Sequence, residues 1–273
     1  MHPPVFEPSA DIFIGNLGHL GFQRFMPHVA LRPWVQCYWV IQSRLTAQGS
    51  TETLYPDGGT NINFYFTPDQ EPRLSFYTRQ IVNRVHLSGE QDCLGIRFRP
   101  GGVAQLLGIS MPEWIGREFS AIDLGFHPLH ELQKRLGELS TTQQRITLVE
   151  QWLLARMEQC SAQPGILQYL LPKLIYGADS IETVCEQIAM SRRKLERKFH
   201  EEVGLSPGQI KQFGRIKLAR KLITDQPHVS LVDVAHHVGF YDQAHFIRQF
   251  QKLTGLTPGQ YRKKKLSQKY NPR

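Results

Sequence analysis

Apolar and polar residues alternate with a period of two along residues 34–100, which is the pattern of half-buried strands. The alternation is clearest over residues 35–41 and 62–66, and residues 80–87 and 94–98 are further strand candidates. Turn-forming residues, including Pro56-Asp57-Gly58-Gly59, separate these segments. Several short strands at such spacing predict a small barrel or sandwich.

The spacing of apolar residues changes to that of amphipathic helices after Gly101-Gly102. Two helices are predicted here. One has Leu129, Leu132, Leu136 and Leu139 on a single face, and the next has Ile146, Val149, Leu153 and Met157 on a single face. We expect these helices to pack on the barrel or against a second subunit. Pro164 and Gly165 interrupt the periodicity, so we place a domain boundary there, between residues 1–163 and residues 164–273.

The second half is predicted to be helical throughout, and it contains an internal repeat. Residues 180–190 align with 230–240, and residues 195–210 align with 246–261, with nine identities in 27 positions. Average residue usage would give about one or two identities by chance. A helix, a tight turn and a second helix, present twice, predict a duplicated helix-turn-helix unit.

The second helix of each unit is predicted to expose a face suited to nucleic acid. In the first unit the core pair is Leu195 and Phe199, which leaves Arg192, Arg193, Glu196 and Arg197 outward. In the second unit the core pair is Phe246 and Phe250, and the outward residues are Asp242, Gln243, Ala244, Ile247 and Arg248. Arginine forks fit guanine or phosphate, and a glutamine amide fits adenine. The alternative is an ordinary solvated, charged helix surface.

Two capping boxes follow the repeated units, Ser206-Pro207-Gly208-Gln209 and Thr257-Pro258-Gly259-Gln260. The first begins a helix that reaches about Thr224, roughly 27 Å long at 1.5 Å per residue. Such a helix would hold the two units about one DNA turn apart, so that both could enter successive major grooves.

The charge of the chain divides in the same way as the pattern. The 273 residues carry a net charge of +8, but residues 164–273 hold 19 Lys and Arg against 9 Asp and Glu, a balance of +10. Residues 1–163 hold the remaining 13 against 15, a balance of −2. This asymmetry indicates a polyanion as the partner of the second half and another role for the first.

Several classes of protein are disfavoured by what the sequence lacks. The four cysteines have no Cys-x-x-Cys spacing, so we expect small buried hydrophobes and no disulfide framework or zinc finger. His86 stands alone, and His127 and His130 have no third ligand, so we expect no metal and no cofactor. There is no apolar run long enough to span a membrane, and the opening residues do not resemble a signal peptide, so we expect a cytoplasmic protein without a membrane partner.

The helical half resembles the AraC/XylS family of transcriptional regulators over about residues 166–265. The resemblance is carried by Gly239-Phe240, Asp242-Gln243, His245-Phe246, Phe250, Gly255, Thr257-Pro258 and Tyr261-Arg262, with Leu195, Arg197, Phe199 and Gly204-Leu205-Ser206-Pro207 as first-unit counterparts. It implies double-stranded DNA and RNA polymerase as partners, and it places base-reading residues at Arg193, Glu196, Arg197, Gln243, Ala244, Ile247 and Arg248. Two positions depart from the family pattern: Ala189 stands where Gly is frequent, and Tyr241 stands where a helix cap is usual, so the second recognition helix is expected to begin at Asp242.

The first half is similar to uncharacterised sensor domains found in a subset of this family. The similarity is carried by Tyr55-Pro56-Asp57-Gly58-Gly59, Asn63-Phe64 and residues 95–102. It implies a cupin-like barrel for an unknown small-molecule effector. The polar groups expected at the pocket are Tyr55, Asp57, Asn63, Arg97 and Arg99.

The sequence therefore predicts an α+β protein, with a β-rich, cupin-like barrel and helices followed by an all-α domain of two helix-turn-helix units joined by a long helix. The function expected is a sequence-specific DNA-binding transcription regulator that responds to a ligand and is not an enzyme, with a homodimer left open. The alternative is a barrel-fold enzyme or a DNA-repair protein with an accessory DNA-binding domain. The cysteine spacing that alkyl-transfer repair proteins of this helix-turn-helix type need is absent.

Overall fold

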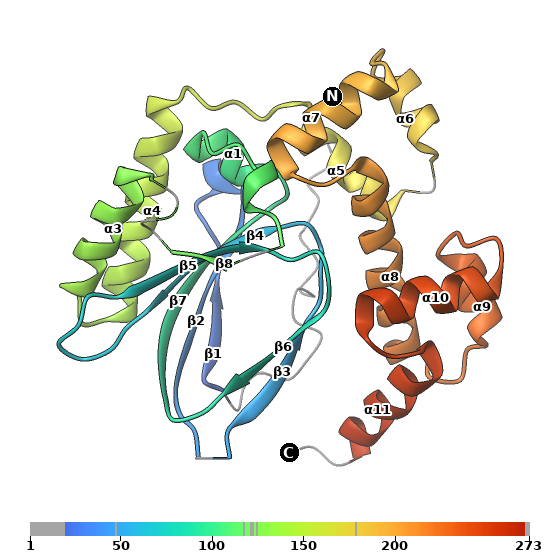
Figure 1. The fold of residues 1–273 in the computed structure, drawn as a ribbon, viewed down its shortest axis with the longest axis horizontal. Coiled ribbons are helices and arrows are strands. Elements are labelled where there is room, and N and C mark those ends of the chain that lie inside the picture. Colours follow the sequence, from blue (N-terminus) through green and yellow to red (C-terminus); the bar gives the residue numbers. More distant parts are fainter. Residues whose placement is uncertain are drawn as a thin grey trace.

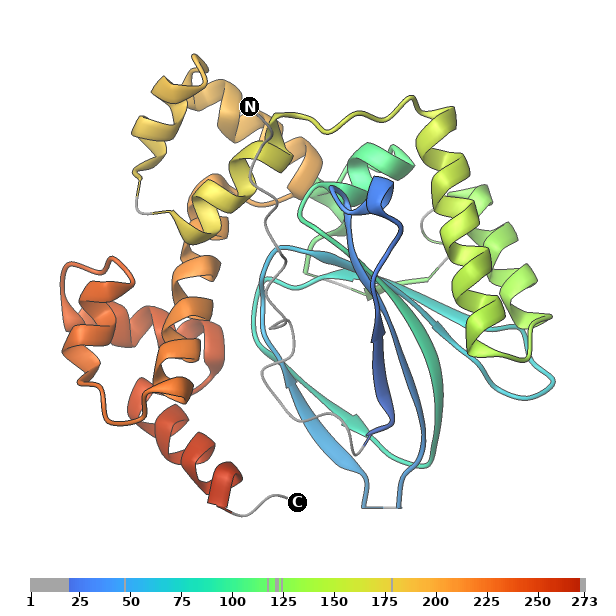
Figure 2. The ribbon, with the colours of Figure 1, turned by 180° about the vertical axis from the view of Figure 1, so that it is seen from behind.

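The computed structural model describes residues 20–46, 48–116, 118–120, 123, 125–177 and 179–270. The opening residues, on which the signal-peptide expectation rests, lie outside this part of the chain. Figures 1 and 2 show a β-rich half built from the first part of the sequence and a helical half built from the last part, lying side by side.

Two antiparallel sheets form the β-rich half. The larger sheet has the order β1 (Phe22–Phe25), β2 (Val35–Arg44), β7 (Glu90–Phe98), β4 (Thr60–Tyr65), β5 (Arg73–Thr78) and β8 (Glu118–Phe119). The smaller sheet pairs β3 (Ser50–Leu54) with β6 (Asn83–Leu87). The predicted α+β class is confirmed, and among the described strands the β-rich half is made of two sheets rather than one closed ring.

Helices cover one face of the larger sheet. They are η2 (Val29–Leu31), α1 (Gly102–Leu107), η3 (Pro112–Trp114), α3 (His127–Gly137) and α4 (Thr142–Gln159). The apolar faces of α3 and α4 lie in the same buried cluster as sheet residues such as Phe64 and Ile96. Of the two arrangements expected for these helices, the structure shows packing on the β-rich half, since Leu132 and Val149 are buried within their own domain.

Seven helices make up the described part of the helical half. They are α5 (Ile166–Tyr176), α6 (Ile181–Gln187), α7 (Arg192–Val203), α8 (Pro207–Asp225), α9 (Leu231–His237), α10 (Gln243–Thr254) and α11 (Pro258–Tyr270). Leu153 is the last fully buried apolar residue in the core that α3 and α4 share with the larger sheet, and Leu167 is the first in the core of the helical half. The domain boundary placed from the sequence lies between these two residues.

The long helix α8 joins the two helix-turn-helix units. Its 19 residues span about 28 Å. Ser206 and Gln209 form the predicted capping box at its start. Ile210, Phe213 and Ile223 are buried in the common core of the helical half, so α8 is part of that core as well as a connection.

The turns within the two units use a left-handed backbone. Gly239 has a φ of 81° in the second unit, as a tight turn requires. Ala189 occupies the corresponding turn of the first unit with a φ of 50°. The missing glycine therefore leaves the turn in place, although a side chain at positive φ is strained.

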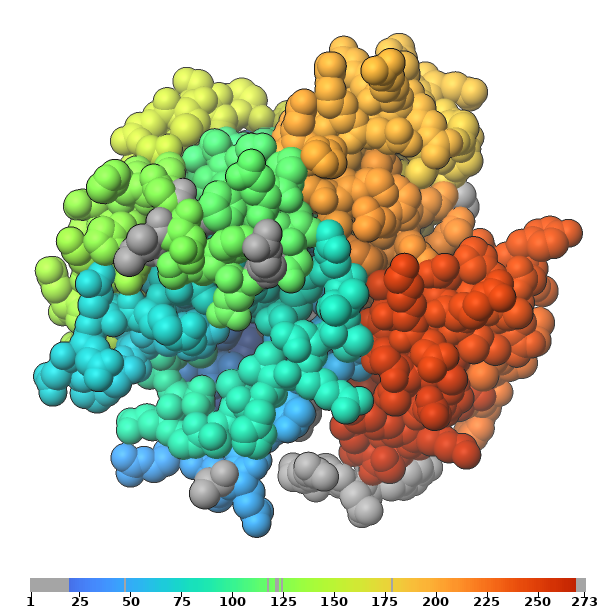
Figure 3. Space-filling model, in the orientation of Figure 1, coloured from blue at the N-terminus to red at the C-terminus, as the bar shows by residue number. Residues whose placement is uncertain are grey.

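The two halves are in direct contact. The backbone N–H of Met111 donates to the carbonyl of Glu201 in α7 at 3.0 Å. The amide of Gln105 in α1 donates to Glu202 at 2.6 Å and accepts from the indole of Trp34 at 2.7 Å. Figure 3 shows the blue-to-green half and the orange-to-red half meeting along a seam.

Candidate nucleic-acid interface and buried cavity

The first predicted recognition helix is α7, and its orientation is fixed by a cap and a buried pair. The Ser191 hydroxyl accepts from the backbone N–H of Lys194 at 3.3 Å. Leu195 and Phe199 are fully buried, as their spacing predicts. The opposite face is exposed and contains all four predicted residues, Arg192, Arg193, Glu196 and Arg197.

The arginines of α7 are not equally available to a ligand. Arg192 forms ion pairs with Glu182 and Glu196. Arg197 lies 3.9 Å from a carboxylate oxygen of Glu201. Arg193 forms no ion pair with any described residue, so its guanidinium can meet a base or a phosphate without first leaving a carboxylate.

The second recognition helix, α10, begins where the sequence predicts. Asp242 is its N-cap and accepts from the backbone N–H of His245 at 2.7 Å. That carboxylate is therefore engaged by its own helix. Gln243, Ala244 and Arg248 are exposed, whereas Ile247 is half-buried against the helical core.

A cavity of about 150 Å³ lies within the β-rich half. Its lining comes from seven strands, β1 to β7, and adjoining loops: Leu20, Phe22, Trp39, Ile41, Glu52, Thr53, Leu54, Tyr55, Asp57, Asn61, Asn63, Tyr65, Tyr77, Arg79, Val85, Leu87, Gln91, Cys93 and Arg97. Four of the five predicted pocket residues are among them. Arg99 is not, because β7 ends at Phe98 and the Arg99 side chain instead donates to the Arg32 carbonyl at 2.8 Å.

An ion pair between Asp57 and Arg97 lies at the edge of this cavity. Arg97 also donates to the Gly59 carbonyl at 3.1 Å, and Asp57 accepts from the Gly59 N–H at 3.1 Å. Burial by itself would raise the pKa of Asp57, but the charge and hydrogen bond of Arg97 outweigh it and hold this pKa below its ordinary value. The positive charge of Arg97 is thus already matched by a carboxylate.

Several lining residues were not predicted from the sequence, including Trp39, Tyr65 and Tyr77. Their places at alternate positions of strands were a usable signal, because Trp39 shares a strand face with Ile41, and Tyr65 shares one with Asn63. Cys93 also lines the cavity, and burial raises the pKa of its thiol to about 12, so it stays protonated near neutrality. Cys37, Cys93 and Cys185 are buried as expected, whereas Cys160 is exposed.

Tyr55 belongs to the cavity wall and also to the contact between the two halves. The Arg220 guanidinium of α8 lies over the Tyr55 ring, 3.4 Å from its centroid. The Tyr261 ring of α11 meets Tyr55 edge to face at 6.5 Å. Nearby, Gly58 has a φ of 80° and lies against Ile210 so closely that a Cβ would clash with it.

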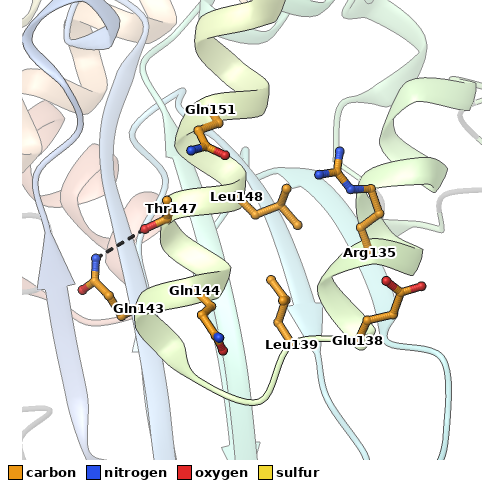
Figure 4. Close-up of a pocket in the computed structure, with 8 residues that line it drawn as sticks. All are labelled: Arg135, Glu138, Leu139, Gln143, Gln144, Thr147, Leu148 and Gln151. Carbon is orange, nitrogen blue, oxygen red and sulfur yellow. Dashed lines mark hydrogen bonds between the residues drawn. The ribbon is translucent and has the colours of Figure 1, made fainter.

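A second hollow lies on the surface between α3 and α4 (Figure 4). It is lined by Arg135, Glu138, Leu139, Gln143, Gln144, Thr147, Leu148 and Gln151. These are mostly solvated polar side chains, and Gln143 donates to Thr147 at 3.5 Å. No three metal-ligating side chains gather anywhere in the described part of the chain, and no described helix is long and apolar enough to cross a membrane.

Comparisons with known proteins match the two halves separately. Residues 184–264 match the family described as helix-turn-helix domain, and residues 23–120 match a domain of unknown function, DUF6597. The chain is 32% identical over 126 residues to the arabinose operon regulatory protein of Escherichia coli K12, a match that covers 43% of each protein. It is 30% identical over 176 residues to an uncharacterized HTH-type transcriptional regulator of Haemophilus influenzae, covering 58% of each. Among solved structures, ToxT from Vibrio cholerae matches at 11% identity, over 82% of this chain and 97% of that chain, with a TM-score of 0.40.

The helix-turn-helix match and the regulators to which the chain is similar support an AraC-family transcriptional regulator. The matches span about half the length of these two curated relatives.

Proposed function

We propose that this chain is a sequence-specific DNA-binding transcription regulator, without enzymatic activity, whose N-terminal half responds to a small molecule. The observation that carries the proposal is the pair of capped recognition helices, α7 and α10, joined by α8 as part of one core. The +10 charge of residues 164–273 supports a polyanionic partner. A contact with RNA polymerase and a homodimer are proposed from the family resemblance alone.

We assign base contacts to both α7 and α10, but with different types of side chain in each helix. Arg193 and Arg197 would contact guanine edges or phosphates in one groove, while Gln243, Ala244 and Arg248 would read the next. Asp242 and Arg192 would act mainly by holding their own helices in place, since both side chains already have partners within the protein.

A selection from a random pool of duplex DNA with the full chain tests this proposal. We expect a two-part site whose halves lie about one helical turn apart. Arg193→Ala should weaken binding to that site by about 1–3 kcal/mol and relax the sequence preference of one half only. Arg44→Ala, which removes an exposed arginine of the β-rich half, is the matched control and should change nothing.

A selection that returns no common sequence, or a site with one half only, would contradict the two-part mechanism. Affinity for the selected site should also fall with salt, with a log-log slope of about −0.9 for each phosphate neutralised. If the affinity did not change with salt concentration, the basic half could not have its assigned role of neutralising DNA phosphates.

The proposed response to a small molecule rests on the position of Tyr55. This residue lines the cavity and packs against Arg220, a residue of the helix that joins the two reading units. A molecule in the cavity could therefore alter the docking of the β-rich half on α8, and through it the affinity for DNA. An enzymatic role receives no support from the cavity, because its thiol is held protonated and its ion pair is internally satisfied.

A further inference from the structure

The lining of the cavity in the β-rich half changes from apolar to polar across the larger sheet. The strand order β1-β2-β7-β4-β5 places apolar lining residues on one side, namely Leu20, Phe22, Trp39 and Ile41. Polar lining residues follow on the other side, namely Asn61, Asn63, Tyr65, Tyr77 and Arg79. An occupant that matches this surface has an apolar end against β1 and β2 and a polar end against β4 and β5.

Three polar atoms on the lining residues are buried and have no hydrogen-bond partner among the described residues. They are Nε1 of Trp39, Oδ1 of Asn63 and Nε of Arg97. These side chains are more than nine-tenths buried, with 8%, 1% and 7% of their residues' surface exposed. Buried polar groups are normally satisfied, so two donors and one acceptor around one cavity indicate a molecule that supplies an acceptor and a donor.

The charges around the cavity oppose a charged occupant. The lining contains the carboxylates Glu52 and Asp57 and the guanidiniums Arg79 and Arg97. Arg97 is paired with Asp57, and Arg79 lies over the Tyr77 ring, 4.1 Å from its centroid. The charges of these four side chains sum to zero, so an ion of either sign would be desolvated beside like charges as well as opposite ones.

The size and the walls of the cavity favour a single ring. A cavity of about 150 Å³ is comparable to one that holds benzene. Phe22 and Trp39 stack on each other with centroids 6.3 Å apart, and Tyr65 and Tyr77 add two further aromatic rings to the lining. Aromatic side chains favour aromatic partners through stacked or edge-to-face contacts.

We propose that the cavity binds an uncharged aromatic compound of about one ring that carries both a hydrogen-bond donor and an acceptor, such as an aromatic amide or phenol. The ring lies toward Phe22 and Trp39, and its polar group meets Asn63 and Arg97. This inference rests on the proposed function in taking the cavity for the effector site, but its test needs no DNA.

Benzamide, benzoate and benzamidinium have nearly the same shape and differ in charge, so they form a matched set of probes. Each is titrated into the full-length protein while the tryptophan indole N–H signals are followed by ¹H–¹⁵N NMR. We expect benzamide to bind at least about tenfold more tightly than either ion. Phenol, which also donates and accepts, should bind in the same range as benzamide.

The protein contains its own control for this measurement. The Trp39 indole signal, identified by its loss in Trp39→Phe, should shift as the ring of the ligand comes to lie against the indole. The Trp34 indole N–H already donates to Gln105 at 2.7 Å and should stay in place. Because both tryptophans are in the wild-type protein, the two signals are compared within one titration, and the Trp39→Phe variant is needed only to assign the Trp39 signal.

Two variants test the polar end of the cavity. Asn63→Leu should weaken benzamide about tenfold, because the amide group of the ligand loses its acceptor. Gln133→Leu is the matched control, since Gln133 is also a buried amide with an unpartnered oxygen but lies outside the cavity, and it should leave binding unchanged. Asp57→Asn frees the charge of Arg97 and should shift the preference from benzamide toward benzoate.

The proposal is overturned if neither benzamide nor phenol binds, if an ion binds as tightly as benzamide to the wild-type protein, or if the Trp39 signal does not move at saturation. These failures leave the proposed DNA binding untouched. Conversely, if benzamide binds as expected but DNA affinity does not change with it, the ligand class stands and the proposed effector response is wrong.

Discussion

The contact between Tyr55 and Arg220 supports a direct prediction about how the two halves hold together. Arg220 is only 5% exposed, and no described carboxylate lies within ion-pair distance of it. Its guanidinium lies over the Tyr55 ring and within 3.4 Å of the Tyr261 hydroxyl. The Tyr55 ring is therefore a main compensation for a buried charge. Tyr55→Leu keeps an apolar side chain in place but removes the face of the ring.

The expected loss is larger than for an ordinary surface contact. A desolvated cation–π contact contributes about 2 kcal/mol, against about 0.5–1 kcal/mol for an exposed one. Tyr55→Leu should therefore lower the free energy of unfolding by about 2 kcal/mol and the thermal midpoint by about 4–8 °C. Tyr55→Phe retains the ring and should stay close to wild type.

Tyr169 provides a matched control on the surface. It is 55% exposed and pairs with Lys173, whose ammonium lies 4.6 Å from the ring centroid. Tyr169→Leu should cost no more than about 0.5–1 kcal/mol. Urea and thermal unfolding of the four proteins, followed by circular dichroism, measure the difference. Equal effects of Tyr55→Leu and Tyr169→Leu would refute the argument that Arg220 depends on the ring of Tyr55.

Two further predictions concern stability. Because Arg97 holds the pKa of Asp57 below its ordinary value, the pair stabilises the fold fully above about pH 5, and this contribution is lost as the pH falls through the lowered pKa. In urea unfolding between about pH 6 and 3, Asp57→Asn should therefore lose less stability than wild type, and an equal pH dependence would contradict this. Ala189→Gly should raise the thermal midpoint by a few degrees, since relief of roughly 1–2 kcal/mol of strain outweighs the added freedom of the unfolded chain, while Gly239→Ala should lower it. A lower midpoint for Ala189→Gly would contradict the strain.

The helical half was predictable because its signals are local. Caps such as Ser191 and Asp242 lie next to the helices that they begin, and core pairs such as Phe246 and Phe250 lie four residues apart. Because the helix-turn-helix unit is duplicated, each of these signals also occurs twice in the sequence. The boundaries and orientations of α7 and α10 could therefore be inferred without tertiary information.

The β-rich half was predicted less completely because its pairings are distant in sequence. Strand β3 is short and largely polar, and it pairs with β6 in a register that joins Ser50 to Leu87. Strands β1 and β5 were also missed. No local pattern specifies such partners, and burial on the cavity side depends on the whole sheet.

The place of Arg99 outside the cavity lining has a simple physical origin. Arg97 and Arg99 are two residues apart, so a continuing strand would place both on the cavity side. Strand β7 ends at Phe98, and the chain turns toward α1. A period-two argument holds only as far as the ladder continues, and the sequence alone did not locate that end.

The position of the interdomain contacts gives α8 a double role. The helix joins the two reading units and contributes Ile210 and Ile223 to their core. It also receives the β-rich half, through Ile210 against Gly58 and Arg220 against Tyr55. Since Tyr55 lines the cavity and residues 57–59 hold Arg97, the segment that borders the cavity is the same segment that docks on α8. In the proposed response to a small molecule, a change in this segment would act directly on α8, the helix that joins the two helix-turn-helix units, with no need for a longer chain of contacts.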